Sequence, residues 1–341
     1  MEWIKKVTLT SFRNYSEKEF TFHPGINLIY GENGIGKSNL LESLLITSIG
    51  RSNKTKNLKE AIQHGASKFY IEILYAKEGI SEKIHLNFDG KIKEILHNQT
   101  KHKSFSSLLG LIPSVVYSPS DVEIITGDPL HRRKFMDIHL AQSDSTYILH
   151  LSRYNKALNH RNALLKSNNM DTIEIWEEQL AKSAQILQEK RRKFIHDLEV
   201  IFNEEFSYFH HKSKVPKVTY KPSPKTFITK ETYKESREKD RLFGFTTIGP
   251  HRDDLIFSLD HEKAKLFSSE GEKRLLVIAL KLASYKMMGA IIFAMDDYLS
   301  FLDANKQKHL MNRLELLPQV FLTTPSNISH PCVHSISIIE K

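Results

Sequence analysis

The segment GENGIGKS, residues 31–38, joins three glycines to a lysine and a serine. It fits the pattern G-x-x-x-x-G-K-[ST] and stands between an apolar run and a leucine-rich one, the strand-to-helix context that the pattern requires. Backbone N–H groups at a helix N-terminus bind phosphate, Lys37 can reach the β- and γ-phosphates, and Ser38 can offer its hydroxyl to Mg²⁺. A glycine-rich turn with an incidental lysine is the simpler alternative. The expected nucleotide-binding residues are Gly31, Glu32, Asn33, Gly34, Ile35, Gly36, Lys37 and Ser38.

Two adjacent acids end another apolar run, AIIFAMDD at residues 290–297. A buried strand there would place Asp296 at the carboxyl end of an open α/β sheet, where ligands bind, so that Asp296 and Ser38 could hold Mg²⁺. Asp297 is then the candidate general base for an attacking water, and Lys37 completes the expected catalytic set. The alternative is that the two acids only end a strand and cap the following segment.

A second turn, FSSEGEKR, precedes another helical pattern that runs to about residue 287. Its Ser269 and Gly271 supply a hydroxyl and bare backbone at a helix N-terminus, which is again a phosphate-binding geometry. Because one nucleotide has one γ-phosphate, two such turns predict a composite site, with the second turn meeting the nucleotide of another subunit. Ser269 and Glu272 also fit a capping box, and the two interpretations are compatible.

The elements that must position these residues form a mixed pattern interrupted by helices. Strand patterns flank a short helix that closes at Gly50, and alternation continues to about residue 98. From about Pro129 apolar residues recur at helical spacing in two series separated by the polar break KSNNMD, which predicts an antiparallel helical hairpin. Strand texture returns near residue 245. We therefore expect a compact α/β fold whose two halves meet in space around a helical insertion.

The composition excludes several classes of protein. Cys332 is the only cysteine, so an internal disulfide and a cysteine-built zinc site are excluded, and the 17 histidines are scattered without ligand spacing. No apolar run approaches the roughly 20 residues of a membrane span, and we expect a cytoplasmic protein with no membrane partner. The 49 Lys+Arg against 40 Asp+Glu give a formal charge of +9, which favours polyanions such as nucleic acid but is weak evidence alone.

The chain resembles the RecF family, the SMC-like ABC-type ATPases of bacterial recombinational repair, over nearly its whole length. The resemblance is carried by motifs in the family's order: LTSFRNY, PGIN, GENGIGKSNLLES, GRSNKT, VVYSPSDVEIITGDPLHRRKFMD, YNKALNHRNALLK, GPHRDDL, FSSEGEKR, MDD and FLTT. It implies an α/β fold, an ABC-type P-loop NTPase head with a mixed sheet and flanking helices, interrupted by an inserted helical arm. The implied parts are residues 1–110 (head with Walker A), 111–240 (arm) and 241–341 (head with signature, Walker B and D-loop).

The resemblance also implies a function. ATP with Mg²⁺ would join two heads face to face, with Ser269 and Gly271 of each acting as signature turn and Asp303 as the D-loop aspartate. The homodimer would bind DNA at gaps or junctions of single and double strands and, with RecR and RecO, promote RecA loading in repair, replication and the SOS response. Slow DNA-stimulated hydrolysis would reset it. The alternatives are an ATP-binding scaffold with negligible hydrolysis, another SMC-like ATPase, or the ATPase subunit of a transporter, which the long insertion and GPHRDDL disfavour.

Three departures from the family stand out: Glu272 in place of glutamine, Phe301 in the D-loop, and a shortened segment at 284–291. Glu272 puts negative charge near a γ-phosphate site, which predicts weak ATPase or altered dimer affinity. His251, Arg252 and Asp253 fit either a functional role or an ion-pair network that joins the halves of the head. The basic clusters that could contact DNA are Arg51, Lys54, Lys56 and Lys59, then Lys190 to Lys193, then Lys212, Lys214 and Lys217.

Overall fold

The computed structural model describes residues 2–102, 104, 106, 108–167, 170–210, 214–298, 303–328 and 331–338. The chain divides into two compact units, Met1–Asp121 with Ile278–Lys341, and Val122–Val277. The boundaries expected from the sequence, at 110/111 and 240/241, differ from these. The reason is strand pairing. β8 (Ser114–Tyr117) pairs with β12 (Ile292–Met295) of the first unit, and β10 (Asp254–Leu259) pairs with β9 (Pro216–Lys221) of the second.

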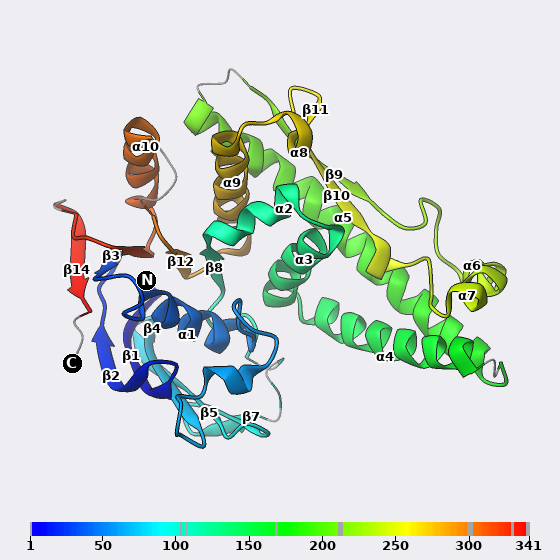
Figure 1. Ribbon diagram of the computed structural model, residues 1–341, viewed down its shortest axis with the longest axis horizontal. Coiled ribbons are helices and arrows are strands. Elements are labelled where there is room, and N and C mark those ends of the chain that lie inside the picture. Colours follow the sequence, from blue (N-terminus) through cyan, green and yellow to red (C-terminus); the bar gives the residue numbers. More distant parts are fainter. Residues whose placement is uncertain are drawn as a thin grey trace. The chain divides into compact units, whose positions relative to one another are not determined.

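The first unit contains two sheets (Figure 1). The antiparallel sheet consists, in spatial order, of β2 (Tyr15–Thr21), β1 (Trp3–Phe12), β4 (Phe69–Lys77), β5 (Ile80–Phe88), β6 (Lys93–His97) and β7 (Thr100–His102). The parallel sheet consists of β14 (Val333–Ser337), β3 (Gly25–Tyr30), β13 (Gln319–Thr324), β12 (Ile292–Met295) and β8. Because β3 pairs with β13 and β14 from the far end of the chain, the two halves meet as predicted.

The helix α1 (Lys37–Ile49) and both sheets share one apolar core. The leucines of α1 lie at helical spacing and are buried. Phe22 packs edge to face against Phe321 of β13, with 4.9 Å between the ring centroids. Gly50 ends α1 in the left-handed conformation, where its N–H donates to the Ile46 carbonyl at 2.8 Å, as predicted from the sequence. The core therefore fixes the start of α1 against the ends of β3 and β12. A further helix of this unit, α10 (Ala304–Leu314), follows β12.

The second unit is mainly helical, with the small antiparallel sheet β11-β10-β9 (Figure 1). Helices α4 (Ser145–Ser167) and α5 (Ile173–His210) form the predicted hairpin. The other elements are α2 (Glu123–Thr126), α3 (Pro129–Ser143), β9 (Pro216–Lys221), α6 (Lys230–Glu235), α7 (Arg237–Phe243), β11 (Glu262–Lys263) and α8 (Ala264–Phe267). The helix α9 (Glu270–Met288) begins in this unit and continues into the first. Across the described ranges we find no helix with the length and apolar character to cross a membrane.

Candidate functional site

The loop between β3 and α1 depends on its glycines. Gly31, Gly34 and Gly36 have φ angles of 152°, 86° and 118°, which side-chain-bearing residues rarely adopt. A Cβ on Gly36 would lie 2.7 Å from the Asn14 amide nitrogen and 2.8 Å from the Tyr15 hydroxyl. Those two side chains bind the loop itself, Asn14 by donating to the Ile35 carbonyl at 2.7 Å. The loop is thus held closely from the β1–β2 turn, and an added methyl group at residue 36 has no room.

Lys37, the first residue of α1, lies folded over this loop. Its Nζ donates to the carbonyls of Gly31 and Glu32 at 2.6 and 2.7 Å. Burial lowers the pKa of Lys37, while the nearby Asp296 and Asp297 carboxylates oppose that shift. The ammonium therefore lies between the loop and the two acids, where a bound anion would meet it.

Asp296 follows β12, the strand between β13 and β8, and its Oδ1 accepts from Ser38 Oγ at 2.8 Å and from Thr323 Oγ1 at 2.6 Å. The next residue, Asp297, is left-handed with φ 54°, and its N–H donates to Thr323 Oγ1 at 2.8 Å. Thr323 thus holds both acids from the neighbouring strand. The sequence analysis included Thr323 only within the motif FLTT. Its contact with the two acids depends on the order of the parallel strands, which that motif alone does not reveal.

Lys37, Ser38, Asp296 and Asp297 line one cavity of about 300 Å³. Gly34, Gly36 and Asn33 of the loop also line it. Its donors toward a metal would be oxygens of a hydroxyl and one or two carboxylates, the set that suits Mg²⁺ when phosphates and waters complete the shell. Among the described residues no group of three or more His, Cys, Asp or Glu is arranged to hold a metal ion.

One lining residue, Lys54, was expected elsewhere. The sequence grouped it with Arg51, Lys56 and Lys59 as a possible DNA contact, yet it borders the cavity. Its Nζ donates to Asn39 Oδ1 at 2.7 Å, on the first turn of α1. The motif GRSNKT can be recognised in the sequence, but the sequence does not show that its loop packs against the first turn of α1.

The Ser269 turn lies in the second unit, and a carboxylate already occupies its donors. Ser269 Oγ and N–H donate to the same Glu272 oxygen at 2.9 and 2.8 Å, and the other oxygen of Glu272 pairs with Lys214. Burial alone would raise the pKa of Glu272, but the bonds from Lys214 and Ser269 outweigh it and lower the pKa to about 2. The capping box is therefore present, and the charge that the sequence left uncompensated at Glu272 has a partner in Lys214. A Cβ on Gly271 would meet no atom within 4 Å.

Asp253 of GPHRDDL forms part of a buried structural network inside the second unit, whereas Arg252 is exposed, with its guanidinium over the Phe245 ring. Asp253 is fully buried and accepts from Arg191 at 2.8 Å, from Tyr220, from the Gln188 amide at 2.9 Å and from the Ser223 N–H at 2.8 Å. Of the two interpretations left open by the sequence, the geometry favours an ion-pair network for Asp253, although it ties elements of the second unit and not the halves of the head.

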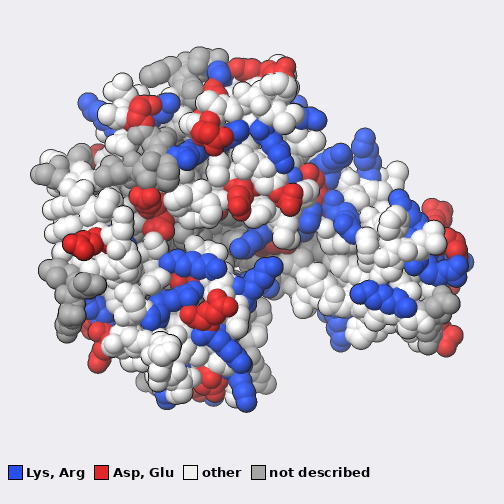
Figure 2. All heavy atoms as spheres, viewed as in Figure 1, with Lys and Arg blue, Asp and Glu red and all other residues white. Residues whose placement is uncertain are grey.

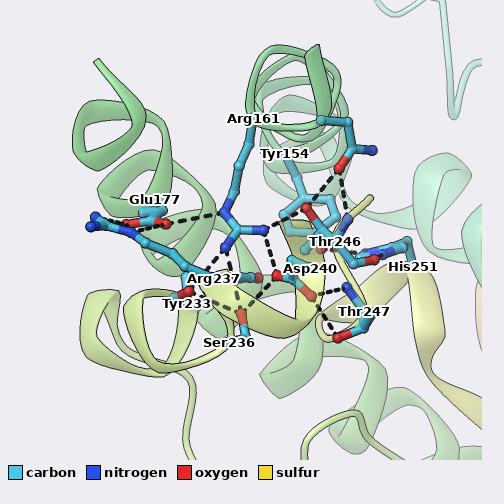
Figure 3. A network of polar contacts seen from close by, with 11 residues as sticks. Tyr154, Arg161, Glu177, Tyr233, Ser236, Arg237, Asp240, Thr246, Thr247 and His251 are labelled. Atoms are coloured by element: carbon cyan, nitrogen blue, oxygen red, sulfur yellow. Dashed lines mark hydrogen bonds and ion pairs between the residues drawn. The ribbon is translucent and has the colours of Figure 1, made fainter. Parts of the chain in front are cut away.

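His251 belongs to the same region, near the network drawn in Figure 3. It donates from Nε2 to the Thr246 carbonyl at 2.9 Å, so its Nδ1 accepts from the Tyr154 hydroxyl at 2.7 Å. Burial lowers the pKa of His251 to about 4, and the ring is neutral near pH 7.

Arg161 of α4 is the centre of that network. It is fully buried and contacts Asp240 at 2.6 Å, Glu177 at 3.2 Å and Thr246 at 2.8 Å. Glu177 of α5 also accepts a fork from Arg237 of α7, with contacts of 2.6 and 2.9 Å. The network joins the helical hairpin to the segment 230–247 and therefore rigidifies the unit.

The remaining predicted residues are more dispersed. Arg191 is buried, and Lys190 pairs with Asp144, so the run Lys190 to Lys193 is not a uniform basic surface. Figure 2 shows Lys and Arg interspersed with Asp and Glu over the visible face. Asp303 caps α10, where it accepts from the Lys306 N–H at 3.0 Å. Lys212 and Phe301 lie outside the described residues.

Comparison with known proteins gives a consistent family. The family model RecF/RecN/SMC N terminal domain matches residues 3–330. The DNA replication and repair protein RecF of Protochlamydia amoebophila (strain UWE25) is 33% identical over 343 residues, which cover 96% of each chain. The protein of the same name from Clostridium novyi (strain NT) is 35% identical, over 92% of this chain and 90% of its own.

Solved structures show the same fold. One, described as the recombination mediator protein RecF-ATPrS in the RecFOR pathway, matches with a TM-score of 0.90 and 28% identity over 98% of this chain and 96% of its own. An Smc head domain from Pyrococcus furiosus has a TM-score of 0.57 at 18% identity, over 96% of this chain and 90% of its own, and supports the fold alone. The predicted fold class, an α/β ABC-type ATPase head interrupted by a helical insertion, is confirmed.

Proposed function

The chain belongs to the RecF family of DNA replication and repair proteins, and from this premise we propose that it is an ATP-dependent DNA-binding protein of recombinational repair and replication-fork maintenance. The observation that carries the proposal is the 2.8 Å bond between Ser38 and Asp296, which brings the phosphate-binding loop and the acidic strand end to one cavity. The similar structure described as RecF-ATP in the RecFOR pathway supports ATP as the nucleotide.

In this proposal the loop amides of residues 31–38 cradle the phosphates, and Lys37 leaves its two loop carbonyls to bind the β- and γ-phosphates. Ser38 and Asp296 would hold Mg²⁺, which when bound neutralises charge on the phosphates. Asp297 holds the proton of the attacking water. The Thr323 hydroxyl holds the backbone N–H of Asp297, and this bond keeps the Asp297 carboxylate at the cavity, where a general base is needed.

The nucleotide acts as a switch more than as a fuel. The signature turn of a second copy, with Ser269 and Gly271, receives the γ-phosphate, and ATP thereby stabilises a homodimer that binds DNA at gaps or junctions of single and double strands. With RecR and RecO the dimer promotes RecA loading, and slow DNA-stimulated hydrolysis through Asp297 ends the bound state. The family membership and the RecFOR description of the similar structure support these partners.

A second candidate is an ATP-binding scaffold with negligible hydrolysis. The observation in its favour is that the Glu272 carboxylate occupies both donors of Ser269. An incoming γ-phosphate must displace this carboxylate before the composite site can form, which would slow or prevent the catalytic arrangement.

The test measures binding to a gapped duplex and to its blunt counterpart with ATP and Mg²⁺, while light scattering follows dimerisation. Wild type is compared with Lys37→Ala, Asp297→Asn and, as a surface control, Lys6→Ala, whose side chain pairs with Glu19 away from the cavity. We expect ATP to drive dimerisation and gap binding, lost in Lys37→Ala, prolonged in Asp297→Asn and unchanged in the control. Equal binding by all four proteins as monomers would refute an ATP-gated mechanism. Unchanged dimer lifetime in Asp297→Asn would favour the scaffold.

A further inference from the structure

Two aromatic rings and a cation form an exposed cluster at the end of α7. Phe243 is the last residue of this helix and is 59% exposed, and Phe245 is 38% exposed. Their ring centroids lie 5.8 Å apart. The exposed Arg252 places its guanidinium over the Phe245 ring, with Cζ 4.9 Å from the ring centroid. We call Phe243, Phe245 and Arg252 the aromatic platform.

Buried hydrogen bonds fix the backbone on both sides of the platform. Thr246 follows Phe245, and its N–H and hydroxyl both donate to Asn162 Oδ1, at 2.8 and 2.7 Å. The Thr246 carbonyl accepts from Nε2 of His251, the residue before Arg252, at 2.9 Å (Figure 3). Phe245 and Arg252 are therefore joined through a bond between their neighbours. The exposed groups are held in place before any ligand arrives, which lowers the entropy lost on binding.

The charges around the platform are mainly positive. Lys166 is exposed at the end of α4, and its Cγ would lie 3.7 Å from a Cβ added to Gly244, the residue between the two rings. Arg133 donates to the Asp253 carbonyl at 2.9 Å, next in the chain to the platform. Glu238, an exposed acid of α7, pairs with an arginine of the same helix at 3.2 Å. The cluster therefore suits a ligand that combines apolar faces with negative charge.

We propose that the aromatic platform binds unpaired bases of single-stranded DNA, with a base stacked on Phe243 and a neighbouring phosphate bound by Arg252. Every nucleobase has a face that can stack on an aromatic ring, and in a duplex those faces are covered by neighbouring base pairs. An apolar protein surface would leave the cations around the rings without partners, which makes it the less favourable occupant. The inference rests on the proposed function, because DNA is the ligand, and it names the part of the chain that distinguishes unpaired from paired bases.

Fluorescence anisotropy with two labelled oligonucleotides tests the stacking. One is oligothymidylate, and the other is an abasic strand of the same length, which has the same phosphates but no bases. We expect the wild-type protein to bind oligothymidylate roughly tenfold more tightly, the effect of one stacked base. Equal affinity for the two strands would overturn the proposal. This comparison uses no variant, so it does not depend on how a substitution affects folding.

Three variants locate the stacking at the platform. Phe243→Leu keeps an apolar side chain but removes the ring, so it should weaken oligothymidylate roughly tenfold and leave the abasic strand unchanged. Phe243→Trp should retain the affinity. Leu242→Ala is the matched control, because Leu242 is the adjacent residue and is 85% exposed, but it has no ring. Equal losses in Leu242→Ala and Phe243→Leu would indicate a general apolar surface, such as a protein contact, and would overturn the proposal.

The phosphate contact of Arg252 has its own readout in the salt dependence of binding. A single strand loses affinity with salt in proportion to the phosphates that the protein neutralises, with a slope of about 0.7 for each. Arg252→Gln should therefore reduce the slope for oligothymidylate by about 0.7, whereas Arg252→Lys and Phe243→Leu should leave it unchanged. An unchanged slope in Arg252→Gln would refute the phosphate contact.

All of these affinities are measured with and without ATP and Mg²⁺, in parallel with binding to the gapped duplex. If the wild-type protein binds the gap with ATP but does not distinguish oligothymidylate from the abasic strand in either condition, only this inference fails. A wild-type protein that binds none of these DNAs in either condition refutes the proposed function as well.

Discussion

The charge at Glu272 should set the ATP concentration at which the protein dimerises. In the structure this carboxylate takes both donors of Ser269 and pairs with Lys214. A γ-phosphate that binds Ser269 must displace it, and the displaced carboxylate stays nearby as a like charge, while Lys214 acts as an attractive one. We therefore predict that Glu272→Gln dimerises at lower ATP than wild type, and Lys214→Met at higher ATP.

The size of the effect follows from Coulomb's law. Two unit charges about 6 Å apart, at an effective dielectric constant of about 40, interact by about 1.4 kcal/mol, which is a factor of about ten. The Lys214 side chain is 40% exposed, so solvent screens part of this interaction. We expect each substitution to move the ATP midpoint by roughly threefold to tenfold, in opposite directions, and the double variant to lie near wild type.

Light scattering across an ATP titration measures these midpoints, in the Asp297→Asn background so that hydrolysis does not deplete the dimer. Lys217→Met serves as the control. Lys217 is exposed on β9, close in the chain to Lys214, and its substitution removes the same charge from the protein as a whole. Raising the salt concentration should shrink the spread between variants.

Coincident midpoints for the two single variants, or the reverse order, would refute the electrostatic reasoning. An equal shift in Lys217→Met and Lys214→Met would show that net charge alone is responsible. If none of the proteins dimerises with ATP, the composite site itself is refuted.

Two further predictions concern the buried groups of the second unit. His251 has a pKa of about 4 against a usual 6.5, so between these pH values the unfolded chain binds more protons than the folded one. The free energy of unfolding should therefore fall by up to about 3 kcal/mol as the pH drops from 6.5 to 4. In denaturant unfolding measured over this pH range His251→Asn should weaken the dependence on pH, and an unchanged dependence would contradict the prediction. Arg161→Met should lower the free energy of unfolding by about 3–5 kcal/mol, because it leaves the buried Asp240 without its cation. Arg237→Met should lower it by about 1 kcal/mol, because its partner Glu177 still pairs with Arg161. Equal losses for the two variants in chemical unfolding would show that burial does not decide the difference.

The nucleotide loop could be predicted from the sequence because its chemistry is contiguous. Glycines, Lys37 and Ser38 lie within eight residues, and the flanking apolar patterns fix the strand and the helix. The position of Asp296 beside Ser38 was also predictable, because an apolar run that ends in acids predicts a buried strand whose carboxyl end faces the ligand side of an open α/β sheet. The pairing of Asp296 with Thr323 required the order of the parallel strands, which local pattern does not contain.

The buried arginines were missed although the sequence held a signal for them. Arg191 continues the apolar spacing of Leu187, Phe194 and Leu198 on α5, so it lies on the buried stripe, but its neighbours made the segment look like a basic surface. The helical spacing alone therefore predicts that Arg191 is buried in the second unit. Lys54 had no such signal, because the loop that carries it is held by the distant Arg13–Glu42 pair and has no periodicity.

The pairing of β3 with β13 and β14 has a consequence for synthesis on the ribosome. When the first 121 residues have emerged, β3 has neither of its neighbours, whereas residues 122–277 form a contiguous unit that can fold as soon as it is complete. The head must then wait for its last strands, and Asp296 lacks its Thr323 partner until β13 is made. A nascent chain that stops before β13 therefore contains all of residues 122–277, but it lacks both neighbours of β3 and the Thr323 hydroxyl that bonds Asp296.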